Sequence, residues 1–164
     1  MTRAGAVQDG RRESAVADAL LAFLPVASAE RLAPVLTDDD VATLKHLFRK
    51  SIPENTLRAI ASDLGYLEAW AMAATGRPLA WPATDETELK FIAHHLFDKA
   101  EKKANPAHGM PDEVAAKLIG EDRMQALPPH APSTVRRRLS HWKKLHKARG
   151  LPHVLNSEEI GLAL

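Results

Sequence analysis

The sequence predicts an all-α protein. Strands require a sustained alternation of apolar and polar residues, and the chain has no such stretch. Several segments instead repeat apolar residues at the three- and four-residue spacing of a helix, behind residues that favour a helix start. The 164 residues, 45% of them hydrophobic and 26% charged, are enough for one core. We therefore expect a compact bundle of four to five helices, with an extra short helix in an insertion.

The first part of the chain, residues 1–35, is expected to form a mobile tail that holds one weak helix. That helix covers residues 14–24 and ends at Pro25, which cannot continue it. The first core helix begins behind Thr37, whose hydroxyl can cap it. Three aspartates follow at the positive end of the helix dipole and strengthen this prediction.

A longer helix is predicted from residue 51 onward. Ser51 with Glu54 three residues later has the pattern of a capping box, and Gly76 ends the helix. Its apolar stripe leaves one face directed away from the core. The residues on that face are Asn55, Arg58, Ala59, Ser62 and Tyr66. Another core helix is expected over residues 84–103.

Residues 105–132 are rich in proline and glycine, which indicates an insertion between two core helices. Within it, residues 111–119 can form a short helix. A helix capped by Ser133 then runs to residue 149, and a last one begins with the capping signature at residues 156–159. The helical domain is therefore expected to span residues 36–164.

The charge of the chain is concentrated in residues 133–149. This segment contains seven basic residues and no acidic one, whereas the remainder has 15 basic against 21 acidic residues. The basic residues are Arg136, Arg137, Arg138, Lys143, Lys144, Lys147 and Arg149. Val135, Leu139 and Trp142 form an apolar stripe, and Arg137 and Lys144 lie opposite it. Such a surface is typical of proteins that bind polyanions.

Other kinds of site find little support. The chain has no cysteine, which excludes disulfides and thiolate metal sites. His94 and Asp98 could touch a metal from one helical turn, but no third ligand is suitably spaced, so we expect no metal and no cofactor. No glycine-rich phosphate loop or catalytic triad indicates an enzyme. No apolar run could span a bilayer and no secretory signal is recognisable, so we expect a cytoplasmic protein without membrane partners.

Two segments resemble the N-terminal core-binding domain of tyrosine recombinases and phage integrases. Residues 54–70 resemble its first motif, and residues 133–152 its second, which closes on His146-x-x-x-Gly150-x-Pro152. Their order and spacing are most similar to Cre-like members. The resemblance implies a SAM-like helical bundle that places two helices in the major groove of a recombination site. The family's catalytic Arg…His-x-x-Arg…Tyr set has no counterpart, so we expect the catalytic domain to be absent and the chain to bind DNA without cutting it.

The resemblance also implies which residues face DNA. In the first helix these are Thr56, Arg58, Ala59 and Ser62; in the second they are Ser133, Thr134, Arg137 and His141. The charge pattern adds Arg136 and Lys144. Double-stranded DNA in the nucleoid is the expected partner. Other recombinase protomers would contact residues 37–50 and 156–164 on DNA, whereas the isolated domain is expected to be monomeric.

Several residues have a structural alternative. Arg58 could form an ion pair with Glu54 or Asp63. Arg138 and Arg149 lie nearer the buried edge of their helix, His146 suits the edge of the core, and Tyr66 suits packing better than nucleophilic chemistry. Trp70, Trp81 and Trp142 are expected as burial anchors.

A different function would also use the basic face. The chain could be a helical adaptor whose cations bind an acidic peptide or protein, and the apolar residues at 160–164 favour such an interaction. Competition between duplex DNA and acidic peptides separates the two functions.

Overall fold

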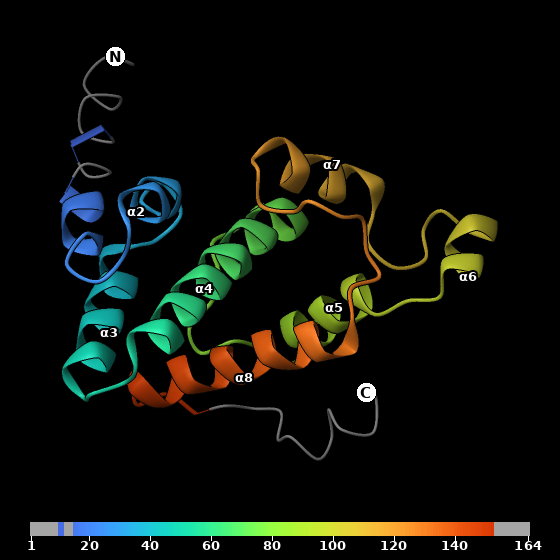
Figure 1. Cartoon of the computed structure of the whole chain (residues 1–164). Coiled ribbons are helices and arrows are strands. Elements are labelled where there is room, and N and C mark those ends of the chain that lie inside the picture. The colour runs from blue at the N-terminus through green and yellow to red at the C-terminus, as the bar shows by residue number, and fades with distance from the viewer. Residues whose placement is uncertain (1–9, 12–14, 153–164) are drawn as a thin grey trace. The chain divides into compact units, whose positions relative to one another are not determined.

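The computed structural model describes residues 10–11 and 15–152. Every regular element in these residues is a helix, which confirms the all-α prediction (Figure 1). The chain divides into two compact units, Met1–Gly65 and Tyr66–Leu164. Helix α4 (Glu54–Thr75) crosses the boundary between them. The helix expected over residues 156–164 lies outside the described residues.

Helices α2 (Val26–Leu32) and α3 (Asp38–Arg49) precede α4 in the first unit, and residues 15–20 before them are also helical. The predicted cap of α3 is confirmed and forms a reciprocal capping box. The Thr37 hydroxyl accepts a hydrogen bond from the Asp40 backbone at 3.1 Å, and the Asp40 carboxylate accepts one from the Thr37 backbone at 2.9 Å.

Helix α2 was not predicted from the sequence. The helix expected over residues 14–24 ends earlier, at Leu20, and a turn separates it from Pro25. Pro25 instead occupies the N-cap position of α2, where proline has no backbone donor to leave unsatisfied. Leu20 and Leu32 are fully buried in this unit. A Cβ atom on Gly65 would collide with the Leu32 side chain, so the absence of a side chain at Gly65 lets α2 and α4 approach closely.

Up to residue 152, the second unit contains four helices after α4. They are α5 (Asp85–His95), α6 (Lys99–Ala104), α7 (Asp112–Gly120) and α8 (Pro132–Ala148). The prediction of a single helix over residues 84–103 is wrong, because the chain leaves the helical conformation between α5 and α6. The Asp98 carboxylate accepts hydrogen bonds from the backbone of Ala100 at 2.7 Å and Glu101 at 3.1 Å. An N-cap in mid-sequence restarts the helix in a new direction.

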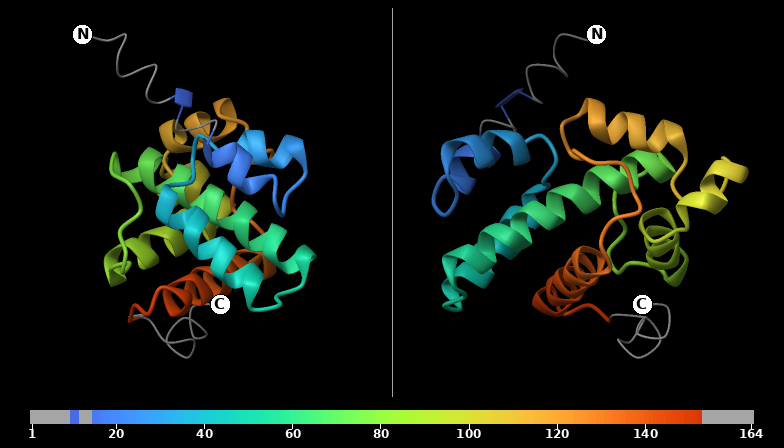
Figure 2. Two further views of the ribbon diagram at one scale, coloured as in Figure 1. Left: turned by 90° about the vertical axis from the view of Figure 1, so that its left-hand side faces the viewer. Right: turned by 45° about the vertical axis from the view of Figure 1, so that its right-hand side comes forward.

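The insertion contains the short helix that the sequence predicts, now α7. Figures 1 and 2 show α7 beside the C-terminal end of α4. Two predicted caps are wrong. Helix α8 begins at Pro132, one residue before Ser133, because the fixed backbone angle of proline suits the first turn. Helix α4 begins at Glu54, so Ser51 lies outside its N-cap position, and the Glu54 carboxylate accepts from Arg58 instead.

Three aromatic side chains form the centre of the second unit. Trp70 of α4 contacts Phe91 of α5 edge to face, with ring centroids 5.1 Å apart. Phe91 contacts Trp142 of α8 in the same manner at 5.9 Å. All three rings are fully buried, which confirms Trp70 and Trp142 as burial anchors, whereas Trp81 is half-buried.

No helix among the described residues is both long enough and apolar enough to cross a membrane.

The capping box of α3 yields a stability prediction. Thr37→Ala removes the acceptor for the Asp40 backbone and should lower the free energy of unfolding by about 1 kcal/mol. Thr37→Ser keeps an acceptor at the same place and should retain most of the stability. Urea unfolding of the full chain measures both variants, and equal midpoints for the alanine and serine variants would contradict a capping role.

Candidate nucleic-acid interface

The apolar stripe of helix α8 packs into the core of the second unit, as predicted. The buried residues of the helix are Val135, Leu139, His141, Trp142, Leu145 and His146. Seventeen residues make α8 about 25 Å long. The burial of one side fixes which side chains project away from the core.

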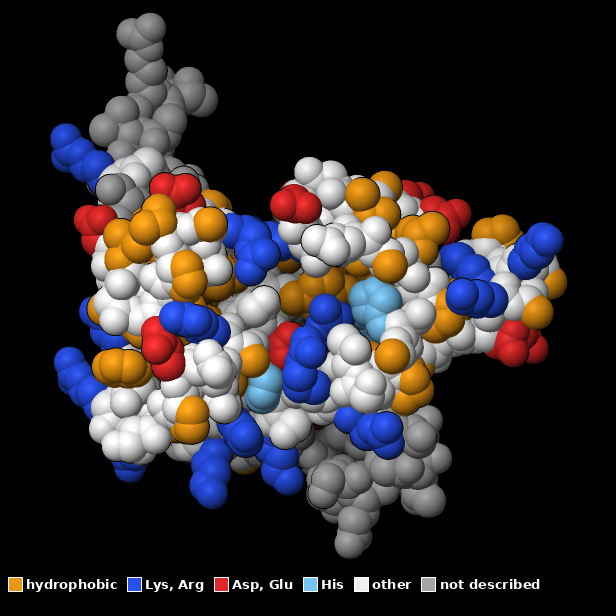
Figure 3. Space-filling view, in the orientation of Figure 1, with side chains coloured by type: hydrophobic (Ala, Val, Ile, Leu, Met, Phe, Trp, Pro, Cys, Tyr) orange, Lys and Arg blue, Asp and Glu red, His pale blue; other side chains and the backbone are white. Residues whose placement is uncertain are grey.

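The opposite side of α8 carries the predicted cations. Its exposed basic residues are Arg136, Arg137, Lys143, Lys144 and Lys147. Figure 3 shows Lys and Arg side chains projecting along the part of the second unit formed by α8. Among the described residues, Arg136, Lys143, Lys144 and Lys147 take part in no ion pair. The positive charge of these four residues is therefore not neutralised by an ion pair within the described part of the chain.

Not every predicted contact of α8 lies on this face. Ser133 is exposed and Thr134 is half-buried, but His141 is only 8% exposed, so its predicted position toward DNA is wrong. His141 lies one helical turn before Leu145, and residues four apart share a side of a helix. The buried stripe of α8 is wider on this side than the apolar residues alone indicated.

Arg138 stabilises the packing of α8 and does not belong to the open cationic face. Its guanidinium carbon lies 3.8 Å from the centre of the Tyr66 ring, and its Nη1 is 3.2 Å from His130 Nδ1. His130 is anchored in turn, because its backbone N–H donates to the His95 carbonyl at 2.9 Å. These contacts confirm that Arg138 lies at the buried edge, where it links α8 to α4 and to the end of the insertion.

Tyr66 is buried, contrary to its predicted position on the open face of α4. Only 4% of it is exposed, and its hydroxyl lies 2.5 Å from His95 Nε2 and 3.9 Å from Met124 Sδ. His95 Nδ1 is 2.7 Å from the Phe91 carbonyl, so Nδ1–H donates there and Nε2 accepts from Tyr66. Burial raises the pKa of Tyr66 to about 12, which keeps the phenol protonated.

A second set of contacts secures the other end of α8. The Ala83 backbone donates to His146 Nε2 at 2.9 Å, and the Arg149 guanidinium lies 3.9 Å from the centre of the Trp81 ring. His146, expected at the edge of the core, is fully buried. These contacts attach the loop between α4 and α5 to the C-terminal end of α8.

The other predicted DNA-facing residues belong to α4 in the first unit. Ser62 is exposed, whereas Thr56 and Ala59 are half-buried. Arg58 Nη2 lies 2.6 Å from Glu54 Oε1, and the two side chains are 42% and 57% exposed. The alternative in which Arg58 pairs with Glu54 is thus confirmed, and an exposed pair of this kind exchanges easily with water or phosphate.

His94 and Asp98 each have another partner in the structure. His94 Nδ1 accepts a hydrogen bond from Trp70 Nε1 at 3.2 Å, and Asp98 caps α6. In the part of the chain that the structure describes, no group of three or more His, Asp or Glu side chains could hold a metal ion. Burial lowers the pKa of His94 to about 4, which suits its role as a hydrogen-bond acceptor.

The polar cluster around Tyr66 was missed by the sequence analysis. Its members Tyr66, His95, His130 and Arg138 come from four separate segments, and no spacing rule connects them. The one available sequence signal is the run from residue 66 to 71, in which every residue except Glu68 is apolar, and the structure buries all of them. A helix buried on all sides is covered by more than one neighbour, and Met124 of the insertion is one of these.

The buried histidines make stability depend on pH. Burial lowers the pKa of His95 to about 3, whereas the unfolded chain titrates near 6.5. The unfolded state therefore binds more protons between these values, and the free energy of unfolding should fall as the pH drops below about 6.5. His95 alone contributes at most about 1.4 kcal/mol per pH unit.

Unfolding in urea between pH 7 and pH 5 tests this dependence. The variant His95→Gln should show a shallower pH dependence than the unmodified chain. The variant His46→Gln, at an exposed position of α3, serves as the control and should keep the original slope. Parallel curves for the His95→Gln variant and the unmodified chain would contradict the assignment of a neutral, buried His95.

Comparison of the sequence with protein-family models and with characterised proteins, and of the fold with solved structures, finds no match.

Proposed function

We propose that this protein is a DNA-binding module of the core-binding type found in tyrosine recombinases and integrases, with Cre-like members the most similar. It binds duplex DNA through the cationic face of α8 and does not cut it. The observation that carries the proposal is the row of five exposed basic residues on one side of a helix whose other side is buried. Double-stranded DNA is the polyanion whose shape suits such a rod.

The dimensions and charge of α8 support this partner. An α-helix with its side chains is about 10–12 Å across, and the major groove is about 12 Å wide. Lysine and arginine side chains along the helix can reach phosphates on both edges of the groove and release their condensed counterions. Ser133 is exposed at the start of α8 and would contact base edges or bound water.

The way α8 is anchored also favours binding. Trp142 holds its middle in the aromatic core, Arg138 holds its first half through Tyr66, and His146 holds its last turn through Ala83. Cations on a fixed helix lose less conformational freedom on binding than cations on a mobile tail.

The environment of Tyr66 supports binding without cleavage. This is the only tyrosine of the chain, and a recombinase of this type needs a tyrosine that can attack a phosphodiester. Its hydroxyl is committed to His95, and burial raises its pKa. A buried and protonated phenol is a poor nucleophile.

Salt dependence is the direct test of the proposal. If the five exposed cations of α8 neutralise five phosphates, the logarithm of the association constant should fall against the logarithm of salt with a slope of about −4 to −5. The triple variant Lys143→Ala, Lys144→Ala, Lys147→Ala should reduce this slope by about 0.9 per lysine. Fluorescence anisotropy with a labelled duplex at several salt concentrations measures both values.

A control of equal charge is available in the same unit. Lys99→Ala, Lys103→Ala, Lys117→Ala removes three exposed lysines of α6 and α7 and should leave the slope nearly unchanged. Equal losses in the two triple variants would show that net charge rather than the α8 face is responsible. Binding displaced by acidic peptides as readily as by duplex DNA would favour the adaptor function instead.

Arg58 allows a separate test in the first unit. Because Glu54 competes with phosphate for Arg58, Glu54→Gln should strengthen DNA binding and Arg58→Ala should weaken it, each by a few-fold. Glu30→Gln, at an exposed position of α2, makes the same change in charge and is the control. A gain equal to that of the control would show that the α4 face takes no part.

A further inference from the structure

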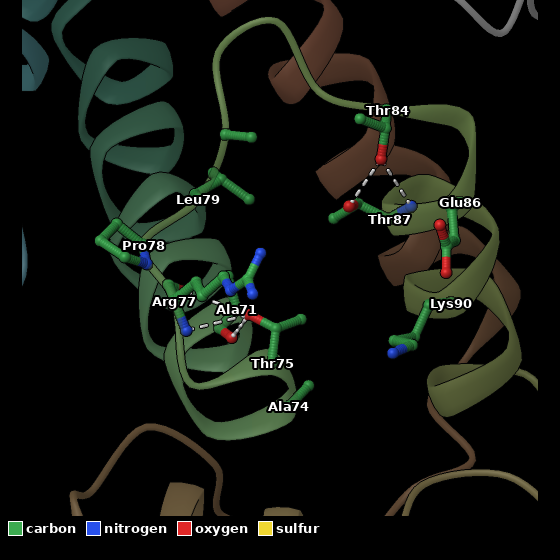
Figure 4. A pocket seen from close by; sticks show the side chains of 11 residues that line it. Ala71, Ala74, Thr75, Arg77, Pro78, Leu79, Thr84, Glu86, Thr87 and Lys90 are labelled. Atoms are coloured by element: carbon green, nitrogen blue, oxygen red, sulfur yellow. Dashed lines mark hydrogen bonds between the residues drawn. The ribbon is translucent and has the colours of Figure 1, made fainter.

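A pocket of about 490 Å³ lies in the second unit, between the C-terminal end of α4 and the N-terminal half of α5. The loop that joins the two helices forms part of its wall. Figure 4 shows α4 and α5 on opposite sides of this space, with the loop above. The volume is in the range of pockets that bind small molecules or short peptide segments.

The walls of the pocket combine apolar and cationic groups. Ala71, Ala74 and Leu79 offer a surface of short apolar side chains. Arg77 and Lys90 project from opposite walls into the space between the helices, and Glu86 lies beside Lys90 (Figure 4). Among the described residues, neither Arg77 nor Lys90 takes part in an ion pair. An occupant that carries both carboxylates and apolar side chains would match these walls.

The chain leaves α8 next to the wall of this pocket. Gly150 has a positive φ of 68°, and the Leu151 backbone donates to the His146 carbonyl at 2.9 Å, which ends the helix. The contacts of Ala83 with His146 and of Trp81 with Arg149 hold this end of α8 against the α4–α5 loop. The same loop lines the pocket through Leu79, Ala80 and Thr84.

We propose that the pocket binds residues 153–164 of the same chain, which lie outside the described residues. This segment contains Glu158 and Glu159, followed by Ile160, Leu162 and Leu164. The carboxylates would approach Arg77 and Lys90, and the apolar side chains would cover the alanine-lined wall. No other stretch of the chain continues from the point where α8 meets the α4–α5 loop.

Tethering makes this interaction effective even if it is weak. Twelve residues can span up to about 40 Å, far enough to cross the loop. A covalent connection of this length provides an effective concentration in the millimolar range, so even a segment with millimolar affinity would occupy the pocket for much of the time. The proposal does not depend on DNA binding, and either can fail without the other.

The absence of cysteine allows a direct experiment on the full chain. A nitroxide label is attached to the cysteine of the Ala163→Cys variant in protein labelled with nitrogen-15. The intensities of the backbone amide signals are then compared before and after the nitroxide is reduced. We expect loss of most of the signal intensity at Ala74, Thr75 and Thr87, and little loss along α6. No loss around the pocket would overturn the proposal.

Charge reversal tests the recognition. Arg77→Glu with Lys90→Glu should restore the signals around the pocket, and adding Glu158→Lys with Glu159→Lys should abolish them again. Lys99→Glu with Lys103→Glu, on α6, is the control of equal charge and should leave the broadening unchanged. If the signals around the pocket stay broadened in the variant with Arg77→Glu and Lys90→Glu, the proposal that residues 153–164 occupy the pocket is overturned.

A mixed sample identifies the source of the segment. Cysteine-free protein that is labelled with nitrogen-15 and carries no nitroxide is mixed with spin-labelled protein that lacks the isotope. Full retention of the signals in this mixture supports docking within one chain. Broadening in the mixture would assign the pocket to a second copy and overturn docking within the same chain.

Discussion

The burial of Trp142 against Phe91 fixes how the helices of the second unit are arranged. Phe91 also contacts Trp70, so a single aromatic cluster joins α4, α5 and α8. Because Trp142 must point into this cluster, the rotation of α8 about its axis is fixed. That rotation decides which of the seven basic residues reach solvent. The electrostatic surface of the protein is therefore a consequence of apolar packing.

A buried polar cluster reinforces this arrangement. The Tyr66 hydroxyl donates to His95 Nε2, and His130 Nδ1 accepts from Arg138, whose guanidinium lies over the Tyr66 ring. In a buried setting such a network is stable only when every member has its partner. The insertion supplies Met124 and His130 to this cluster, so it completes the burial of α4 and positions the first half of α8.

The loop between α4 and α5 has two roles in the structure. It secures the end of α8 through Ala83 and Trp81, and it forms a wall of the pocket that contains Arg77 and Lys90. The two cationic surfaces of the second unit differ in kind. The face of α8 is open and suited to a long polyanion, whereas the pocket is concave and suited to a short segment with both acidic and apolar residues.

The fold class, the helices α3, α4, α7 and α8, and the concentration of charge on α8 were predictable from the sequence, because helical spacing, caps and composition are local properties. Tertiary structure decided which charged and polar residues of α8 stay open: Arg138 and Arg149 lie over aromatic rings, and His141 is buried. It also decided the position of Tyr66, since the insertion that covers it is distant in sequence. Residues that one helix alone would expose become buried when a second neighbour packs on them, and local periodicity contains no information about that neighbour.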